Sequence, residues 1–110
     1  MARFIKGDVV VLPFPFSDLS ASKRRPALVL ADLTSNDIIL CQITSQQTKD
    51  AYAISLTDSD MINGSLKKSS NIRPNRIFTA DKNIILYKIG SIASAKSQEV
   101  RNKIIEILDQ

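Results

Sequence analysis

The residues best suited to chemistry are three consecutive cations, Lys23, Arg24 and Arg25, which stand directly before Pro26. Proline disfavours the helical region for the residue before it, so Arg25 should be extended where a strand begins. A guanidinium carries a permanent charge and a planar fork of donors that matches two phosphate oxygens. Side chains alternate along an extended chain, so Lys23 and Arg25 should share one face. The triplet favours phosphate binding, although a solvated basic edge that protects a sheet from aggregation would have the same composition.

A second polar group follows an apolar run of the sequence. Residues 38–43 are mostly aliphatic and lead into the polar residues 44–46. If the runs 27–30 and 38–43 are antiparallel neighbours, the start of the first lies beside the end of the second. Arg25 and Thr44 would then meet at one end of the sheet. Taken alone, a threonine at a strand end is more often structural.

Several familiar catalytic devices are missing from the sequence. The chain has no histidine, so histidine acid–base catalysis is excluded. Its single cysteine, Cys41, lies inside an apolar run and is expected to be a small buried hydrophobe. Three scattered glycines do not form a phosphate-binding loop. We therefore expect neither a metal site nor a cofactor.

Length and composition predict one domain, residues 1–110. Apolar residues make up 44% and charged residues 24%, which is ordinary for a soluble globular protein. No apolar run approaches the ~20 residues of a membrane span, and the first residues do not form a signal peptide, so we expect a cytoplasmic protein. A net charge of +4 favours a polyanionic partner, either nucleic acid or an acidic protein.

Short apolar runs, bounded by turn residues and prolines, predict a mostly β chain. Pro13 and Pro15 should exclude residues 13–16 from a central strand. This segment is expected to be an extended edge or a loop, with Phe14 and Phe16 turned inward or onto a partner. Pro74 similarly indicates an edge or a bulge. The expected strands cover residues 9–12, 27–30, 38–43, 53–56 and 83–92, the last with a bend at Gly90.

Two helical segments are expected. Residues 58–63 fit a single helical turn that Gly64 ends. Ser97 fits an N-cap for a helix over 98–108, with Glu99 in its first turn. The apolar face of that helix, which should lie on the sheet, consists of Val100, Ile104, Ile107 and Leu108. The expected fold class is mainly β (α+β): a small antiparallel barrel with a C-terminal helix.

Three segments together resemble the MazF/PemK family of toxin endoribonucleases from type II toxin–antitoxin systems. They are Gly7-Asp8-Val9-Val10, Arg25-Pro26-Ala27-Leu28-Val29-Leu30 and Ile43-Thr44-Ser45-Gln46. Their order and spacing fit over most of the chain, and the C-terminal third matches more loosely. The resemblance implies an SH3-like barrel, a homodimer and a cognate antitoxin as partner. It also implies metal-independent, sequence-specific cleavage of single-stranded RNA, which leaves 2′,3′-cyclic phosphate and 5′-hydroxyl ends.

The resemblance also assigns roles to residues. Arg25 and Thr44 correspond to the catalytic pair of the family. Many members carry a glutamate in the loop before Arg-Pro, where residues 17–22 of this chain offer only Asp18 as a proton-transfer partner. The residues that would hold the RNA backbone or read its bases are Lys23, Arg24, Ser45, Gln46 and Lys49.

Two alternatives use the same fold without catalysis. Some toxins with this barrel bind DNA gyrase and cleave no RNA, but the terminal tryptophan expected for that reading is missing here. A non-catalytic module that only binds an antitoxin or RNA is the other alternative. An RNA-cleavage assay separates both from the nuclease.

Overall fold

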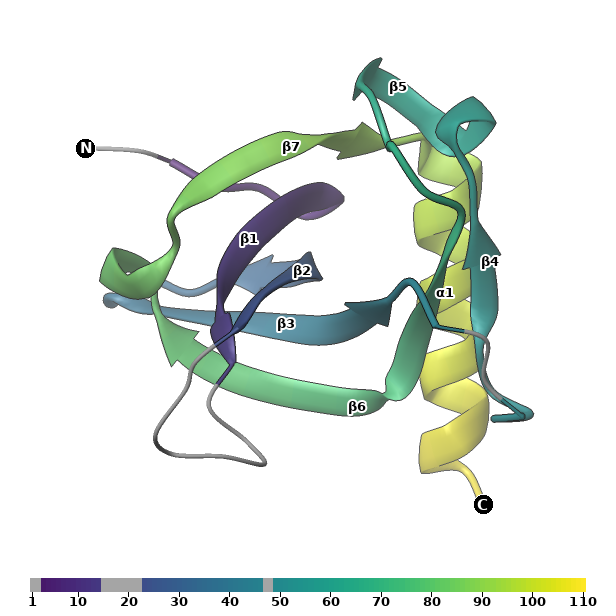
Figure 1. The fold of residues 1–110 in the computed structure, drawn as a ribbon. Helices are drawn as coiled ribbons and strands as arrows, with labels where there is room; N and C mark the ends of the chain where they lie inside the picture. Colours follow the sequence, from purple (N-terminus) through teal and green to yellow (C-terminus); the bar gives the residue numbers. More distant parts are fainter. Residues whose placement is uncertain (1–2, 15–22, 47–48) are drawn as a thin grey trace.

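The apolar runs form one curved antiparallel sheet of seven strands in a computed structural model, which describes residues 3–14, 23–46 and 49–110 (Figure 1). The strand order is β4-β6-β3-β2-β1-β7-β5, and α1 packs alongside. This half-barrel confirms the predicted mainly β fold with a C-terminal helix. The elements in chain order are β1 (Asp8–Phe14), β2 (Lys23–Asp32), β3 (Asp37–Thr44), β4 (Ile54–Leu56), the 3₁₀ turn η1 (Asp58–Asp60), β5 (Met61–Gly64), β6 (Ser70–Asp81), the 3₁₀ turn η2 (Lys82–Ile84), β7 (Tyr87–Ile92) and α1 (Ser94–Leu108).

The central strands are buried on both faces, which explains why their sequences read as continuous apolar runs. Alternate residues enter two clusters: Val9, Leu28, Cys41 and Ile43 join the helix residue Val100 in one, and Val10, Leu12, Ala27, Val29 and Leu40 form most of the other. Cys41 is fully buried, as predicted, and burial raises the pKa of its thiol to about 12. Among the described helices, none has both the length and the hydropathy needed to cross a bilayer.

The first strand runs further than the sequence suggested. Pro13 and Phe14 both belong to β1, so the strand predicted over residues 9–12 is two residues longer, and the two added residues lie at an edge, one of the two places predicted for them. Strand β7 pairs with β1 only as far as Val11, so beyond that point β1 has a neighbour on one side only, where proline is tolerated. Phe14 turns inward, as predicted, and meets Phe78 edge-to-face at 5.1 Å between ring centroids. Phe16 lies outside the described residues.

The prediction for residues 58–63 holds only for its first half. The 3₁₀ turn ends at Asp60, and the following residues form β5, which pairs with β7. This strand approaches β7 so closely that a Cβ on Gly90 would lie 2.2 Å from the carbonyl oxygen of Asn63. Pairing with β7 therefore overrides the local turn signal. Strand β7 itself begins only at Tyr87, because residues 82–84 form η2. The sequence predicts an edge or a bulge at Pro74, and the structure shows a bulge, because the register of β6 against β3 shifts between Arg73 and Ile77.

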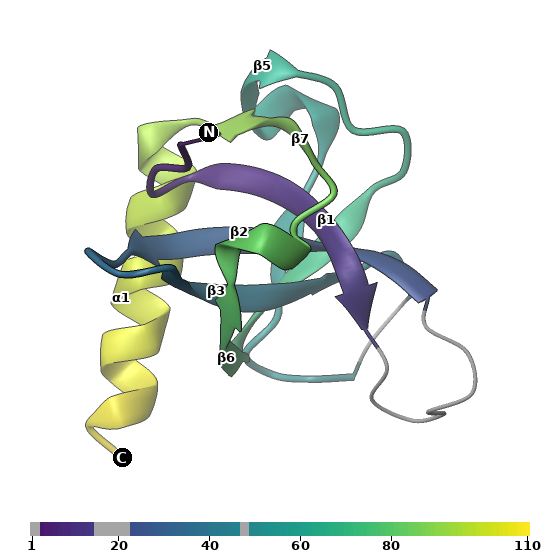
Figure 2. The same ribbon diagram turned by 90° about the vertical axis from the view of Figure 1, so that its left-hand side faces the viewer.

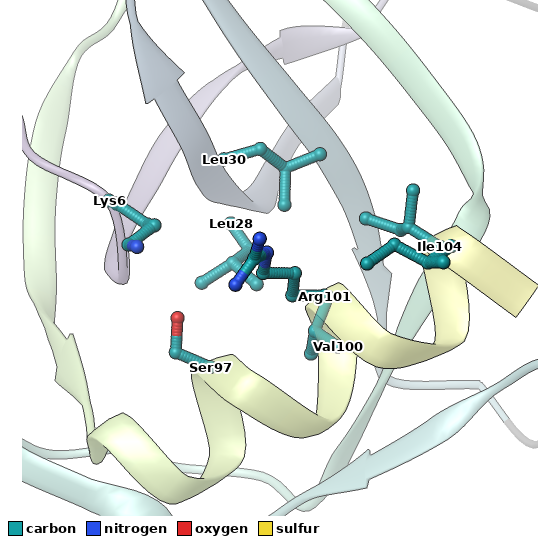
Figure 3. A pocket seen from close by; sticks show the side chains of 8 residues that line it. Lys6, Leu28, Leu30, Ser97, Val100, Arg101 and Ile104 are labelled. Carbon is teal, nitrogen blue, oxygen red and sulfur yellow. The ribbon is translucent and has the colours of Figure 1, made fainter.

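The helix begins at Ser94, four residues before the predicted start, so Ser97 lies inside it and is not the N-cap. Val100 packs in the same apolar cluster as Leu28 (Figure 3). Ile104 and Ile107 are half-buried, but Leu108 is 74% exposed, so its predicted place on the sheet is wrong. Figures 1 and 2 show the last turn of α1 reaching past the strands, which leaves this side chain without a surface to cover.

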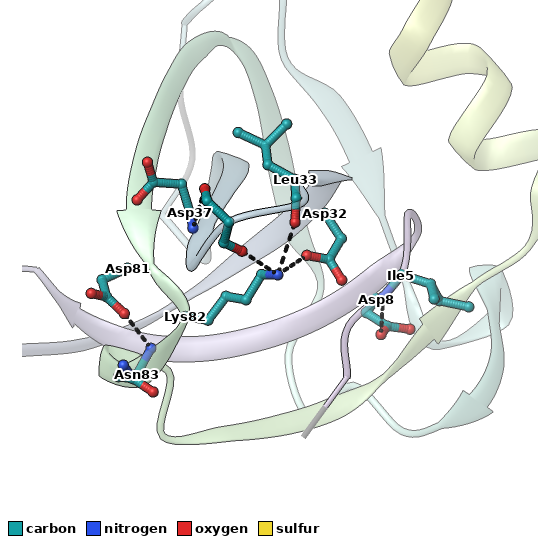
Figure 4. Close-up of polar contacts among 9 residues, drawn as sticks. Ile5, Asp8, Asp32, Leu33, Asp37, Asp81, Lys82 and Asn83 are labelled. Carbon is teal, nitrogen blue, oxygen red and sulfur yellow. Dashed lines mark hydrogen bonds and ion pairs between the residues drawn. The ribbon is translucent and has the colours of Figure 1, made fainter. Parts of the chain in front are cut away.

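The connection between β2 and β3 is held from outside by one lysine. The Lys82 amine donates hydrogen bonds to the carbonyl oxygens of Leu33 and Ser35, at 3.0 and 2.9 Å, and forms an ion pair with Asp32 (Figure 4). The lysine thus ties the end of β6 to the hairpin that positions the ends of β2 and β3.

A buried carboxylate anchors the start of β1. Asp8 is fully buried and accepts a hydrogen bond from the Ser91 hydroxyl at 2.8 Å. It accepts a second one from the Ile5 backbone N–H at 3.0 Å (Figure 4). The amine of Lys88, whose side chain is 42% exposed, lies 3.3 Å away. Asp8 therefore joins β1, β7 and the N-terminal segment in one polar network.

Replacing Asp8 by alanine should lower the free energy of unfolding by about 2–4 kcal/mol, because the buried Ser91 hydroxyl and the part-buried Ile5 N–H lose their acceptor. Lys88→Ala is the matched control and should cost less than about 1 kcal/mol, since this partly exposed amine can return to water. Urea unfolding at pH 7 measures both values. Equal losses for the two variants would contradict this account of Asp8.

Candidate functional site

The pairing of β2 with β3 brings the two principal candidates to one end of the sheet. The strands are antiparallel neighbours, as predicted, and Ala27 pairs with Gln42. This is the last pair of the two strands, and Arg25 and Thr44 each lie two residues beyond it, so the same register would set them opposite each other. In Figure 2 the beginning of β2 lies at the side of the view opposite to α1. Directly opposed residues on neighbouring strands have Cβ atoms about 5 Å apart, so both side chains can reach one small ligand.

Arg25 differs from the other half-buried cations in the described part of the chain. Its guanidinium forms no ion pair or side-chain hydrogen bond with the described residues, and Leu12 is its neighbour on β1. A partly desolvated charge without a partner is unfavourable unless an anion completes it. Each of the others is paired: Arg73 with Asp50, Lys82 with Asp32, Lys96 with Asp60 and Glu99, and Lys103 with Glu106.

Thr44 presents a hydroxyl oriented by the chain that follows it. The residue is buried, and its Oγ1 accepts a hydrogen bond from the backbone N–H of Gln46 at 3.2 Å. This bond occupies a lone pair, and no described residue accepts the hydroxyl proton. The proton is therefore available for a ligand bound beside Arg25. The side chains of Ser45 and Gln46 are exposed next to it.

A second arginine lies beside the pair, and the sequence analysis missed it. Arg73 of β6 pairs with Gln42, two residues before Thr44 on β3. Its Nε and Nη2 donate to Oδ2 of Asp50 at 3.3 and 3.2 Å. The signal was present in the sequence, because Arg73 precedes Pro74 just as Arg25 precedes Pro26.

Asp50 is held as a carboxylate by several donors. The backbone N–H of Tyr52 donates to it at 2.9 Å, and this bond, with the side chains of Arg73 and Asn75, lowers its pKa below the usual value. A carboxylate stabilised in this way is a poor proton acceptor. The ion pair therefore joins the segment after Thr44 to β6, and the charge of Arg73 is already balanced.

The remaining predicted residues surround this end of the sheet or fall outside the description. Lys23, Arg24 and Lys49 are exposed and have no ion-pair partner among the described residues. Alternation along β2 puts Lys23 on the face of Arg25 and Arg24 on the other face. Asp18 lies outside the described residues. Within the described ranges, no three His, Cys, Asp or Glu side chains come together as a metal-binding group.

Comparison with known proteins decides the family. Residues 5–108 match the family model described as PemK-like, MazF-like toxin of type II toxin–antitoxin system. The chain belongs to this family. The resemblance noted from the three sequence segments is thereby confirmed. No curated protein matches the sequence.

Solved structures of MazF proteins share the fold. MazF in the MazE–MazF complex (Form-III) from Deinococcus radiodurans superposes with a TM-score of 0.77 at 20% identity, covering 97% of each chain. MazF (Form-I) from the same organism gives 0.75 at 20% identity over 100% of both chains. An endoribonuclease in complex with its cognate antitoxin, from a mycobacterial species, gives 0.77 at 13% identity, covering 97% of this chain and 96% of the other. At these identities the likeness establishes the MazF fold.

Asp50→Ala should lower the free energy of unfolding by about 1–3 kcal/mol at pH 7, because a charged hydrogen-bonded pair is lost. The pKa of Asp50 is lowered in the folded state, so its stabilising effect is present above the unfolded-state pKa of about 3.9. It is lost as the pH falls through the lower, folded-state pKa. The difference in the free energy of unfolding between wild type and Asp50→Ala should therefore become smaller as the pH is lowered below about 4.

Urea unfolding at a series of pH values between 7 and 2.5 tests this dependence. Asp37→Ala is the control, because Asp37 is exposed and its carboxylate has no hydrogen-bond or ion-pair partner among the described residues. If Asp50→Ala lowers the free energy of unfolding by the same amount at every pH in this series, the stabilising role assigned to the Asp50 charge is contradicted.

Proposed function

We propose that this chain is the toxin of a type II toxin–antitoxin system and a sequence-specific endoribonuclease that cleaves single-stranded RNA. The observation that carries the proposal is the half-buried guanidinium of Arg25, which has no partner among the described residues and lies two residues beyond the Ala27–Gln42 pair, toward the end of β3 at Thr44. A fixed positive charge and a hydrogen-bond donor on one side of a small site suit a phosphate. Membership of the MazF-like family makes RNA the expected source of that phosphate.

The proposed reaction uses a nucleophile that the substrate itself carries. The 2′-oxygen of RNA attacks the adjacent phosphorus, the bond from phosphorus to the 5′-oxygen breaks, and a 2′,3′-cyclic phosphate and a 5′-hydroxyl result. One proton leaves the 2′-oxygen and another is added to the departing 5′-oxygen. Arg25 balances the charge that builds up on the pentacoordinate phosphate, and Thr44 donates to a non-bridging oxygen. Preorganised charges of this kind are often the largest contribution to catalysis.

The proton acceptor is proposed separately. A guanidinium stays protonated at neutral pH and cannot take the proton from the 2′-hydroxyl. Asp50 is also unsuited, because its donors hold it as a weakly basic carboxylate. We assign this role to Asp18, the only carboxylate of residues 17–22, which directly precede the basic triplet in the sequence.

Exposed residues near Arg25 would bind the rest of the RNA. Lys23, Arg24 and Lys49 have no carboxylate partner among the described residues, and unstacked bases offer their edges to Ser45 and Gln46. The proposed assembly is a cytoplasmic homodimer that a cognate antitoxin silences. Two of the structural relatives, the mycobacterial endoribonuclease and the Deinococcus MazF, are complexes with an antitoxin or with MazE.

Arg25→Ala should lower kcat/KM for RNA cleavage about 10²–10³-fold, because the positioned charge acts on the transition state. Thr44→Ala should have a smaller effect, about 10-fold, through the loss of one hydrogen bond. Lys67→Ala is the control, since Lys67 is an exposed cation on the β5–β6 connection. Initial rates on a fluorescent single-stranded RNA measure all three. Equal losses for Arg25→Ala and Lys67→Ala would mean that net charge, not placement, drives cleavage.

A single 2′-deoxy substitution at the cut site should abolish cleavage there, because the attacking oxygen is gone. Cleavage of the unmodified RNA should continue in excess EDTA, and its 3′ product should accept phosphate from a polynucleotide kinase without prior dephosphorylation. Gel analysis of end-labelled RNA reads all three results. Cleavage that survives the deoxy substitution, or that stops in EDTA, would overturn the mechanism. No cleavage of any RNA would favour the non-catalytic alternatives.

A further inference from the structure

A pocket of about 210 Å³ lies between α1, β2 and the N-terminal segment, and the proposed cleavage chemistry makes no use of it. Its apolar floor is built from Leu28 and Leu30 of β2 with Val100 and Ile104 of α1. Figure 3 shows the amine of Lys6, the hydroxyl of Ser97 and the guanidinium of Arg101 around the same space. We call this pocket, lined also by Ile105, the α1–β2 groove.

The groove is separate from the cleavage site. Leu28 and Arg25 belong to the same strand, but they are three residues apart and so point to opposite faces of the sheet. Leu28 belongs to the apolar cluster that includes Val100. Ala27 and Val29, which lie on the same face of β2 as Arg25, belong to the other cluster. A ligand in the groove would therefore lie on the opposite face of β2 from the proposed RNA site.

The helix face beside the groove lacks a partner. Ile105 is 44% exposed and Leu108 is 74% exposed, and both lie on the side of α1 that carries Arg101. Neither Lys6 nor Arg101 forms an ion pair or side-chain hydrogen bond with the described residues. An apolar hollow bordered by two cations that no described residue neutralises suits a ligand with a large apolar group next to a negative charge. For size, a cavity of about 150 Å³ accepts a benzene molecule, so this one can take a leucine or phenylalanine side chain.

Charge selects among the possible occupants. A two-fold contact between two copies, centred on the groove, would bring the Lys6 and Arg101 pairs of both copies together, which is repulsive. A nucleic-acid backbone would place phosphates over the apolar floor of Leu28 and Leu30, where they lose hydration without gaining a partner. An acidic peptide segment avoids both penalties, because its carboxylates meet the cations and its apolar side chain fills the floor.

We infer that the α1–β2 groove is a docking site for an acidic peptide segment that inserts a large apolar side chain over Leu28 and Leu30 and pairs its carboxylates with Lys6 and Arg101. The inference deepens the proposed function, since the antitoxin of that function is the partner that would supply the segment. Only the identity of the partner rests on the proposed function. The groove and its charges stand without it.

The test uses a fluorescein-labelled 12-residue peptide of Leu-Glu-Glu repeats and the full chain, with fluorescence anisotropy in the absence of RNA. The peptide should bind, and peptides with Ala-Glu-Glu or Leu-Gln-Gln repeats should bind at least ten-fold more weakly. The double variant Lys6→Gln/Arg101→Gln should lose at least ten-fold in affinity. The matched control, Lys67→Gln/Lys68→Gln, removes the same charge from the β5–β6 connection and should stay within two-fold.

The position of the bound peptide is determined from amide chemical shifts in a ¹⁵N–¹H correlation spectrum. The peptide should shift amides of residues 28–30 and 97–105. Thermal unfolding followed by circular dichroism checks that both double variants are folded. If the groove variant should prove unfolded, Ile105→Ala replaces it and should weaken binding about three-fold, because its exposed side chain borders the groove.

Four results would overturn the inference. They are the absence of binding, equal losses for the two charge variants, peptide-induced shifts confined to the Arg25 end of β2, and a self-association that requires Lys6 and Arg101. Binding is measured without RNA, so a chain that cleaves no RNA can still bind the peptide, and a chain that binds no peptide can still cleave. Failure of one proposal is thereby distinguished from failure of the other.

Discussion

The antiparallel register between β2 and β3 is the constraint on which the candidate site depends. Side chains alternate with a period of two, so a slip of one residue would move Arg25 to the opposite face from Thr44. The register is strongly specified because both faces of these strands are buried, in two separate apolar clusters. Lys82 adds a second restraint at the far end, where its amine holds two carbonyl groups of the connecting turn. A change of register would therefore remove apolar side chains of both strands from the core, and this cost keeps the site in its arrangement.

Two Arg-Pro dipeptides show how the surroundings decide the use of the same side chain. Proline makes the backbone extended at Arg25 and at Arg73, and the strands place them on either side of β3. Arg73 is neutralised by Asp50, and it ties the segment after Thr44 to β6. Arg25 has no such partner in the described residues, so its charge is free for a ligand. Of two otherwise similar residues, one is thus used to hold the fold together and the other keeps a charge that no described residue neutralises.

The two faces of β2 present different chemistry. On the face of Arg25 a cation stands beside a hydroxyl and polar side chains, which suits a phosphate. On the other face, Leu28 and Leu30 form the apolar floor of a groove bordered by Lys6 and Arg101, which suits an acidic segment with an apolar anchor. A basic protein can in this way attract two kinds of anionic partner without a shared site. The two kinds of partner are distinguished by the apolar surface beside the cations, because a ligand that covers such surface must carry an apolar group as well as a negative charge.

Much of this was determined by the sequence alone. Apolar runs and turn residues predicted β1, β2, β3 and β4, Pro74 predicted an edge or a bulge, and Arg25 with Thr44 was selected from strand order and pairing. These signals are local, or need only the pairing of neighbouring strands. The differences arose where contacts between distant residues prevail: β5 forms because β7 pairs with it, and β1 continues through Phe14 because β2 still pairs with it.

The tertiary structure alone decided three things. It brought Arg73 and Asp50 together from positions 23 residues apart, it left Leu108 exposed beyond the strands, and it left Arg25 without a partner among the residues that the structure describes. Each depends on which surfaces meet after the chain has closed on itself, and no local pattern encodes that. The sequence therefore determined which residues were available for chemistry, and packing decided which of their charges stayed free.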